Sequence, residues 1–210
     1  MNTVHSQPVS FFETTGFLFA YGSNMNLKQL AHRCHSAKVL GVARLDHHKI
    51  GFYGYSEEWD GALETVEECE GKTVWGALIA LNDYDWDSLD QWMDARLDGA
   101  GVYFHFPVTV TGSDGKEYVC RIYKKDVLEQ PEKPSQPYLN HIIEGATDLH
   151  LPQEYIDRLR SIEVKQATYA VPVRCGSDLG TGTAGRGCSE CASAAPVVEQ
   201  KGPLCVLQSI

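Results

Sequence analysis

The chain lacks the charge that nucleic acids and anionic membranes attract. Of its 210 residues, 18 are Lys or Arg and 28 are Asp or Glu, so the net charge is −10 at pH 7. Both kinds of partner require a basic surface, and we expect neither. No apolar run approaches the roughly 20 residues of a membrane-spanning helix, and residues 1–16 lack the basic-then-apolar pattern of a signal peptide. We therefore expect a cytoplasmic protein with reduced thiols.

Internal repeats of the length found in solenoids are also missing. The 43% hydrophobic and 22% charged content is typical of a globular protein. We expect a flexible leader at 1–15, one domain at 16–165 and a tail at 166–210 that contains Gly and Cys. Residues 176–187 are mostly Gly, Ser and Thr, which favours a flexible tail.

The apolar pattern predicts an α+β domain in which a small mixed β-barrel or sheet packs with about four helices. Strands are expected at 17–20, 37–55, 59–66, 73–81, 103–111 and 116–124, with an acidic turn at 67–72 and a hairpin turn at 113–115. Helices are expected at 26–32, 82–93, 139–149 and 153–162. The strand at 73–81 is expected to pair with the strand at 59–66.

The most informative segment is Tyr21-Gly22-Ser23-Asn24-Met25, which joins an apolar strand to a helix. A strand, a tight polar turn and a helix together direct backbone N–H groups toward an anion. Gly22 lets a ligand approach the backbone, and Ser23 or Asn24 can cap the helix and contact that ligand. An ordinary strand-to-helix turn has the same composition, so the segment alone leaves both interpretations open.

This segment resembles the Tyr-Gly-Ser-Asn motif of the gamma-glutamylcyclotransferase-like family, which is related to AIG2-like proteins. Further blocks follow in the family's order at 74–78, 88–90, 101–103, 134–138, 142–146 and 151–155. The resemblance covers roughly residues 15–165 and implies a small barrel packed with helices. It also implies an enzyme that releases 5-oxoproline from gamma-glutamyl amino acids or amides, within glutathione metabolism and without a cofactor. The substrate's own α-amine attacks its side-chain carbonyl. The oligomeric state is not predicted.

By this resemblance, the turn from Tyr21 to Met25 holds the glutamyl group, and Tyr103 and Tyr138 complete the pocket. Without the resemblance, both tyrosines would be interpreted as packing residues. The reaction also needs a group that takes a proton from the α-ammonium and returns one to the leaving amine. Family members place a glutamate shortly after the pair that corresponds to 89–90. Counting from the two ends of this segment gives Met93 or Arg96, and neither is a carboxylate.

We predict that Asp94 carries the proton transfer, with Asp98 as the second choice. Three interpretations of Asp94 compete: a substitute general base, a partner of Arg96 or of a substrate cation, and a solvated residue in a protein that has lost the activity. Asp98 precedes Gly-Ala-Gly and is also suited to a turn. Glu57, Glu58 and Glu64 are reserve carboxylates.

Two further function classes remain open. One is a non-catalytic small-molecule-binding protein that keeps the turn and has lost the base. The other is a biosynthetic enzyme that removes a gamma-glutamyl group from an intermediate.

Two cysteine-containing groups share some features with metal sites. Cys175, Cys188, Cys191 and Cys205 contain one C-x2-C pair, whereas a zinc ribbon has two. A flexible tail with incidental cysteines is the preferred interpretation. His32, Cys34 and His35 form a second cluster, but a structural site needs four ligands. We therefore predict no metal. His105 shares a strand face with Tyr103 and is a possible pocket contact.

Overall fold

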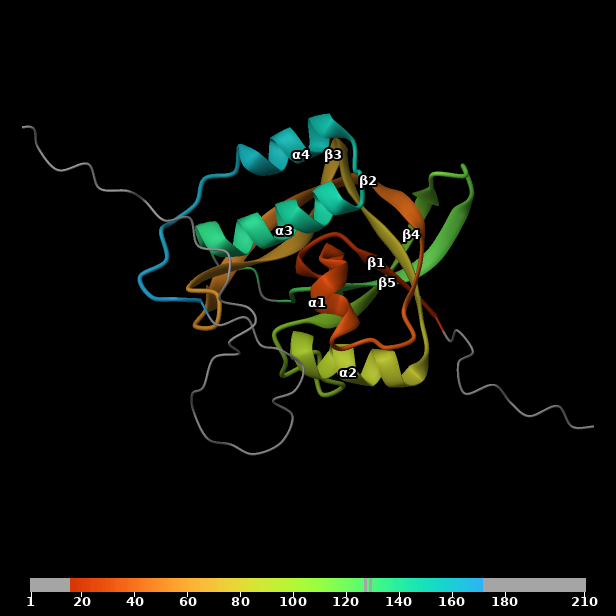
Figure 1. Ribbon diagram of the computed structural model, residues 1–210, viewed down its shortest axis with the longest axis horizontal. Helices are drawn as coiled ribbons and strands as arrows, with labels where there is room; N and C mark the ends of the chain where they lie inside the picture. The colour runs from red at the N-terminus through yellow and green to blue at the C-terminus, as the bar shows by residue number, and fades with distance from the viewer. Residues whose placement is uncertain (1–15, 127, 129, 172–210) are drawn as a thin grey trace, which may run out of the picture. The chain divides into compact units, whose positions relative to one another are not determined.

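The computed structural model describes residues 16–126, 128 and 130–171 (Figure 1). Its elements, in chain order, are β1 (Gly16–Ala20), the 3-10 turn η1 (Ser23–Met25), α1 (Leu27–Ala31), β2 (Lys38–Ser56), β3 (Gly61–Leu81), α2 (Asp83–Met93), β4 (Phe104–Gly112), β5 (Glu117–Lys124), α3 (Gln136–Asp148) and α4 (Gln153–Arg160).

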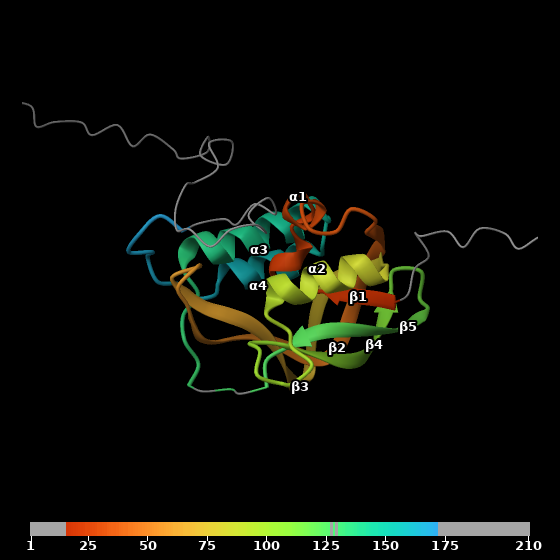
Figure 2. The same cartoon turned by 90° about the horizontal axis from the view of Figure 1, so that it is seen from below.

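The five strands close into a barrel in the order β1-β3-β2-β4-β5. β1 pairs antiparallel with β3 along its whole length and closes the barrel through a parallel bridge from Leu18 to Arg121 of β5. Figure 2 shows α1, α2, α3 and α4 on one side of the barrel strands. The predicted α+β class, with a small barrel and about four helices, is confirmed.

β3 differs from the prediction because it is one strand of 21 residues. The predicted acidic turn at 67–72 is wrong: Glu67 and Glu68 continue the ladder opposite Lys49 and His48 of β2. The predicted pairing of 73–81 with 59–66 is wrong for the same reason, since both halves pair with β2 and the second half also pairs with β1. Residues 67–72 are mostly solvent-exposed on both faces, so they carry no apolar alternation by which a strand could be recognised.

α3 packs directly on the turn that follows β1. A Cβ on Gly145 of α3 would lie 2.6 Å from Asn26 N, so only glycine allows this approach. α3 begins at Gln136, three residues earlier than predicted, because Ser135 caps it: the Ser135 Oγ accepts a hydrogen bond from Tyr138 N at 3.4 Å. This early start places Tyr138 in the first turn of the helix.

Contacts with the domain continue past residue 165, where we expected the tail to begin. Lys165 N donates to Pro134 O at 3.0 Å. The Thr168 hydroxyl donates to Asp60 at 2.8 Å, and the Lys165 ammonium lies 2.6 Å from the same carboxylate. Within the described part of the chain, no helix combines the length and apolar character needed to cross a membrane.

Candidate active site

The turn after β1 has the predicted strand–turn–helix form, with a different cap. Gly22 precedes η1, and α1 begins two residues after η1 ends. The prediction that Ser23 or Asn24 caps the helix is wrong, because Asn26 does so: its Oδ1 accepts a hydrogen bond from the backbone N–H three residues on, at 3.1 Å. Ser23 and Asn24 are instead buried within the turn.

A carboxylate from β3 lies against this turn. Glu64 is only 3% exposed, and its Oε1 accepts hydrogen bonds from Ser23 N at 2.8 Å and from Ser23 Oγ at 3.2 Å. Its Oε2 accepts a hydrogen bond from the Tyr138 hydroxyl. The Tyr103 hydroxyl, just before β4, donates to the Glu64 backbone oxygen at 2.8 Å. Four separate parts of the fold therefore meet at Glu64.

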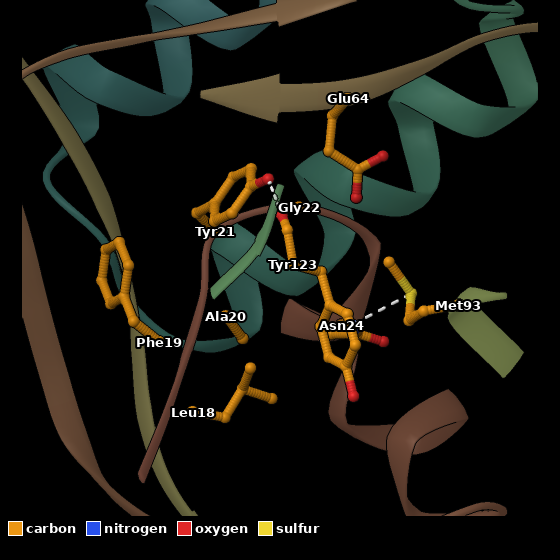
Figure 3. Close-up of a pocket in the computed structure, with 9 residues that line it drawn as sticks. All are labelled: Leu18, Phe19, Ala20, Tyr21, Gly22, Asn24, Glu64, Met93 and Tyr123. Carbon is orange, nitrogen blue, oxygen red and sulfur yellow. Dashed lines mark hydrogen bonds between the residues drawn. The ribbon is translucent and has the colours of Figure 1, made fainter. Parts of the chain in front are cut away.

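Gly22 is required here because the Glu64 side chain comes so close. A Cβ on Gly22 would lie 2.0 Å from Glu64 Oε1 and 2.4 Å from its Cδ, far inside normal contact distance. The sequence predicts that Gly22 leaves room for a ligand, whereas in the structure Glu64 takes that room. Figure 3 shows the Glu64 carboxylate pointing from β3 toward the turn.

The three tyrosines predicted at the site are all buried. Burial raises the pKa values of Tyr21, Tyr103 and Tyr138 well above that of a free tyrosine, and the negative charge of Glu64 raises them further. The hydroxyls therefore stay protonated and act as donors. Tyr21 donates to the backbone oxygen of Tyr123, whereas the other two donate to Glu64.

A small cavity borders the Glu64 carboxylate (Figure 3). Its volume is about 10 Å³, which is room for roughly one water-sized group. Asn24 and Met93 line it, and Asn24 Nδ2 donates to Met93 Sδ at 3.4 Å. The Asn24 Oδ1 is buried and has no hydrogen-bond partner among the described residues. A carboxylate and an unpaired amide oxygen thus border one space, an arrangement suited to a cationic donor.

A larger open pocket of about 350 Å³ lies beside these residues. Its walls come from the turn, the β2–β3 connection, the end of α2, the segment before β4 and the start of α3. The lining residues are Ser23, Ser56, Glu58, Trp59, Leu63, Gln91, Trp92, Met93, Asp94, Val102, Tyr103 and Tyr138. Met93 lines both cavities, and three hydrogen-bond partners of Glu64 line the larger one: Ser23, Tyr103 and Tyr138.

Asp94 lies in the wall of this larger pocket, but its carboxylate is occupied locally. It ends α2 in the left-handed conformation, with φ 46°. Its Oδ1 accepts a hydrogen bond from Arg96 Nε at 2.7 Å, and its Oδ2 accepts one from Val102 N at 3.3 Å. The side chain is 39% exposed. The structure thus contains the Arg96 pair that the sequence offered as one interpretation, and proton transfer by Asp94 stays a prediction.

Of the remaining candidates, Glu58 lines the larger pocket, whereas Asp98, Met25 and His105 lie outside both cavities. Asp98 is exposed and accepts a hydrogen bond from Ala100 N at 3.0 Å, as a turn residue does. Met25 is fully buried in the hydrophobic core. His105 Nε2 lies 2.7 Å from Asp90 Oδ1, so its partner is a carboxylate of α2.

Within the described part of the chain, the His32, Cys34 and His35 cluster contributes nothing to this site. Cys34 is buried, and burial raises its thiol pKa to about 12, whereas His32 and His35 are exposed. Among the described residues, no three His, Cys, Asp or Glu side chains gather as metal ligands. The four cysteines Cys175, Cys188, Cys191 and Cys205 lie outside the described residues.

Sequence reasoning underestimated Glu64, which it kept only as a reserve carboxylate. The sequence contains one signal: Ala62, Glu64 and Val66 occupy alternate positions of a strand and so share one face. In the structure all three are buried on the inward face of β3. A carboxylate between two apolar inward positions marks a polar site within a core. Trp59 and Trp92, which line the larger pocket, carried no comparable signal.

The chain is similar in sequence and in fold to known proteins. A profile described as the AIG2-like family matches residues 73–159. A mouse (Mus musculus) protein named gamma-glutamylcyclotransferase is 35% identical over 153 residues, which are 71% of this chain and 79% of the relative. A bovine (Bos taurus) protein of the same name is 37% identical over 149 residues, 69% of this chain and 77% of the relative. A solved structure titled gamma-glutamyl cyclotransferase superposes with a TM-score of 0.69 at 33% identity and covers 74% of this chain and 92% of that one. The chain belongs to the gamma-glutamylcyclotransferase family.

Proposed function

We propose that this protein is a gamma-glutamylcyclotransferase that releases 5-oxoproline from a gamma-glutamyl amino acid or amide. One observation carries the proposal: the Tyr21–Met25 turn, Tyr103 and Tyr138 surround a buried carboxylate beside a cavity of about 10 Å³. This arrangement suits a small substrate with a positive charge at one end and a carbonyl to be attacked. The names of the relatives support the same reaction.

The chemistry is an intramolecular ring closure, so the protein's main task is to hold the substrate folded. The α-nitrogen must meet the side-chain carbonyl, and the reaction gains from this proximity. A carboxylate in the site accepts the proton that the α-ammonium must lose before it can attack. Backbone N–H groups of the turn are donors of the kind that stabilise the oxyanion of the tetrahedral intermediate. The reaction as written consumes no water, metal or cofactor.

The leaving group is proposed to occupy the larger pocket of about 350 Å³. The pocket is open to solvent, and its lining combines Trp59 and Trp92 with polar side chains. It leaves space for an amino acid or an amine beyond the scissile amide. The sequence predicts Asp94, in this pocket's wall, as the proton-transfer group, with Asp98 second. We propose glutathione metabolism in the cytoplasm as the setting, with a small gamma-glutamyl molecule as the partner.

The test is a direct assay of the purified full-length protein. The protein is incubated with a panel of gamma-glutamyl amino acids and gamma-glutamyl amides, and 5-oxoproline is quantified by mass spectrometry. We expect release from at least one member, at a rate that scales with protein concentration. Saturable binding of a panel member without any 5-oxoproline would favour the non-catalytic binding protein instead.

A further inference from the structure

Glu64 carries a carboxylate that is almost completely buried. A carboxylate withdrawn from water is costly unless donors surround it. Here Ser23 supplies a backbone N–H and a hydroxyl, and Tyr138 supplies a second hydroxyl. These three donors hold the side chain in one position against the turn. A position fixed by bonds from two separate elements is the preorganisation that a proton-transfer group needs.

The size and the lining of the cavity beside Glu64 indicate which substrate group binds there. The cavity of about 10 Å³ accommodates one group the size of water, and a primary ammonium has about that size. Its lining includes Glu64 and the buried Asn24, whose Oδ1 has no partner among the described residues. An ammonium donates three hydrogen bonds and accepts none. Both acceptors at this cavity therefore match an ammonium, and neither matches an anion.

The other acidic candidates fit this role less well. Both oxygens of Asp94 are engaged by its own loop, and Arg96 neutralises its charge at a 39% exposed position. Asp90 is turned away toward His105 and Tyr123, which lie 2.7 Å and 2.5 Å from its Oδ1.

We infer that Glu64 of β3 is the catalytic acid/base, which binds the substrate's α-ammonium together with Asn24 Oδ1 and transfers its protons. This inference rests on the proposed function and names the residue that performs it. Glu64 lies 41 residues from Ser23 in the sequence and occupies neither of the positions to which counting along the chain leads.

With Glu64 as the proton carrier, the protons of the substrate and of the products balance. The substrate starts with three protons on its α-nitrogen and one on the amide nitrogen that leaves. Glu64 takes one proton, the freed amine attacks the side-chain carbonyl, and the new C–N bond forms as the carbonyl electrons move to oxygen. When the oxyanion collapses, the old amide bond breaks. The lactam keeps one proton on its nitrogen and the leaving amine departs with three, so two protons have moved and Glu64 is a carboxylate again.

The test compares Glu64→Gln with Glu67→Gln, a matched change three residues along the same strand. Glu67 pairs with Lys49 at 3.5 Å and lines neither cavity. We expect Glu64→Gln to lower kcat for 5-oxoproline release by about 10²–10⁴-fold, the range for a lost general acid/base. Glu67→Gln should stay within about twofold of wild type. The amide oxygen of a glutamine at position 64 can still accept the bonds from Ser23, and its NH2 group can donate to the Tyr138 hydroxyl oxygen, so the melting temperature should stay near that of wild type.

Glu64→Asp provides a second variant that keeps the charge. It withdraws the carboxylate by about one methylene, and a misplacement of about 1 Å is enough to cost roughly 10²-fold in rate. An active Glu64→Gln or a fully active Glu64→Asp would overturn the assignment. So would a collapse of turnover in Asp94→Asn while Glu64→Gln remains active, which would return the role to Asp94. A wild-type protein that releases no 5-oxoproline from any panel member would instead refute the proposed function itself.

Discussion

Replacement of Gly22 by alanine should force Glu64 away from the turn. The new Cβ would lie 2.0 Å from Glu64 Oε1, whereas ordinary contact begins at 3.4 Å, so the carboxylate must withdraw by about 1.4 Å. The hydrogen bond from Ser23 N, now 2.8 Å, would then exceed its limit. Overpacking of a core site costs about 1–3 kcal/mol, and a lost hydrogen bond to a charged group costs about 1.5–3 kcal/mol.

We therefore expect Gly22→Ala to lower the free energy of unfolding by roughly 2.5–6 kcal/mol, or the melting temperature by roughly 5–24 °C for a chain of this length. The assay is a double-mutant cycle with Glu64→Ala, followed by urea or thermal unfolding. Once the carboxylate is gone, the added methyl group has nothing to displace, so Gly22→Ala should cost little in the Glu64→Ala background. Equal costs in the two backgrounds would show that the methyl group does not act through Glu64.

Two further predictions concern pH. Burial lowers the pKa of His141 to about 4, although the negative charge of Glu144 acts to raise it. The unfolded chain therefore binds more protons below pH 6.5, and the free energy of unfolding should fall by roughly 3 kcal/mol between pH 6.5 and 4. His141→Gln should make the melting temperature nearly constant between pH 6.5 and 5. Hydrogen bonds from Lys165, Thr168 and Tyr55 hold the pKa of Asp60 well below its usual value, so its contribution is present above about pH 4 and is lost as pH falls further. Asp60→Asn should lower the melting temperature at pH 7 and reduce the loss below pH 4, and an unchanged acid limb would contradict this account.

The parts of the site that the sequence predicts well are those made by neighbouring residues. The turn from Gly22 to Met25 follows from a strand, a glycine and a short helix within a dozen residues, and the resemblance places a ligand there. Met25 is the exception, since its side chain packs in the core. The alternation of apolar and polar residues along one segment does not reveal which distant strand or helix will face it.

The contacts that complete the site join residues far apart in the chain. Glu64 is 41 residues from Ser23 and 74 from Tyr138, and these partners depend on the closure of the barrel and on the packing of α3 against the turn. The prediction also divided β3 into two strands, which removed the long register that places Glu64 opposite Phe52 of β2. Because the prediction ended the strand before the exposed residues 67–72, it did not show that Glu64 faces the inside of the barrel.

The chemistry of position 64 helps to separate the competing functions. A neutral glutamine there would accept from Ser23 through its oxygen and donate to the Tyr138 hydroxyl through its NH2 group, at a lower desolvation cost. What a carboxylate adds is a negative charge and the capacity to take up a proton, and neither is needed to hold the turn together. A binding protein that had lost its base would gain nothing from that charge except attraction for a cation. Full stability combined with lost turnover in Glu64→Gln would therefore identify a charge that serves the reaction, whereas a loss of stability with activity retained would identify one that serves the fold.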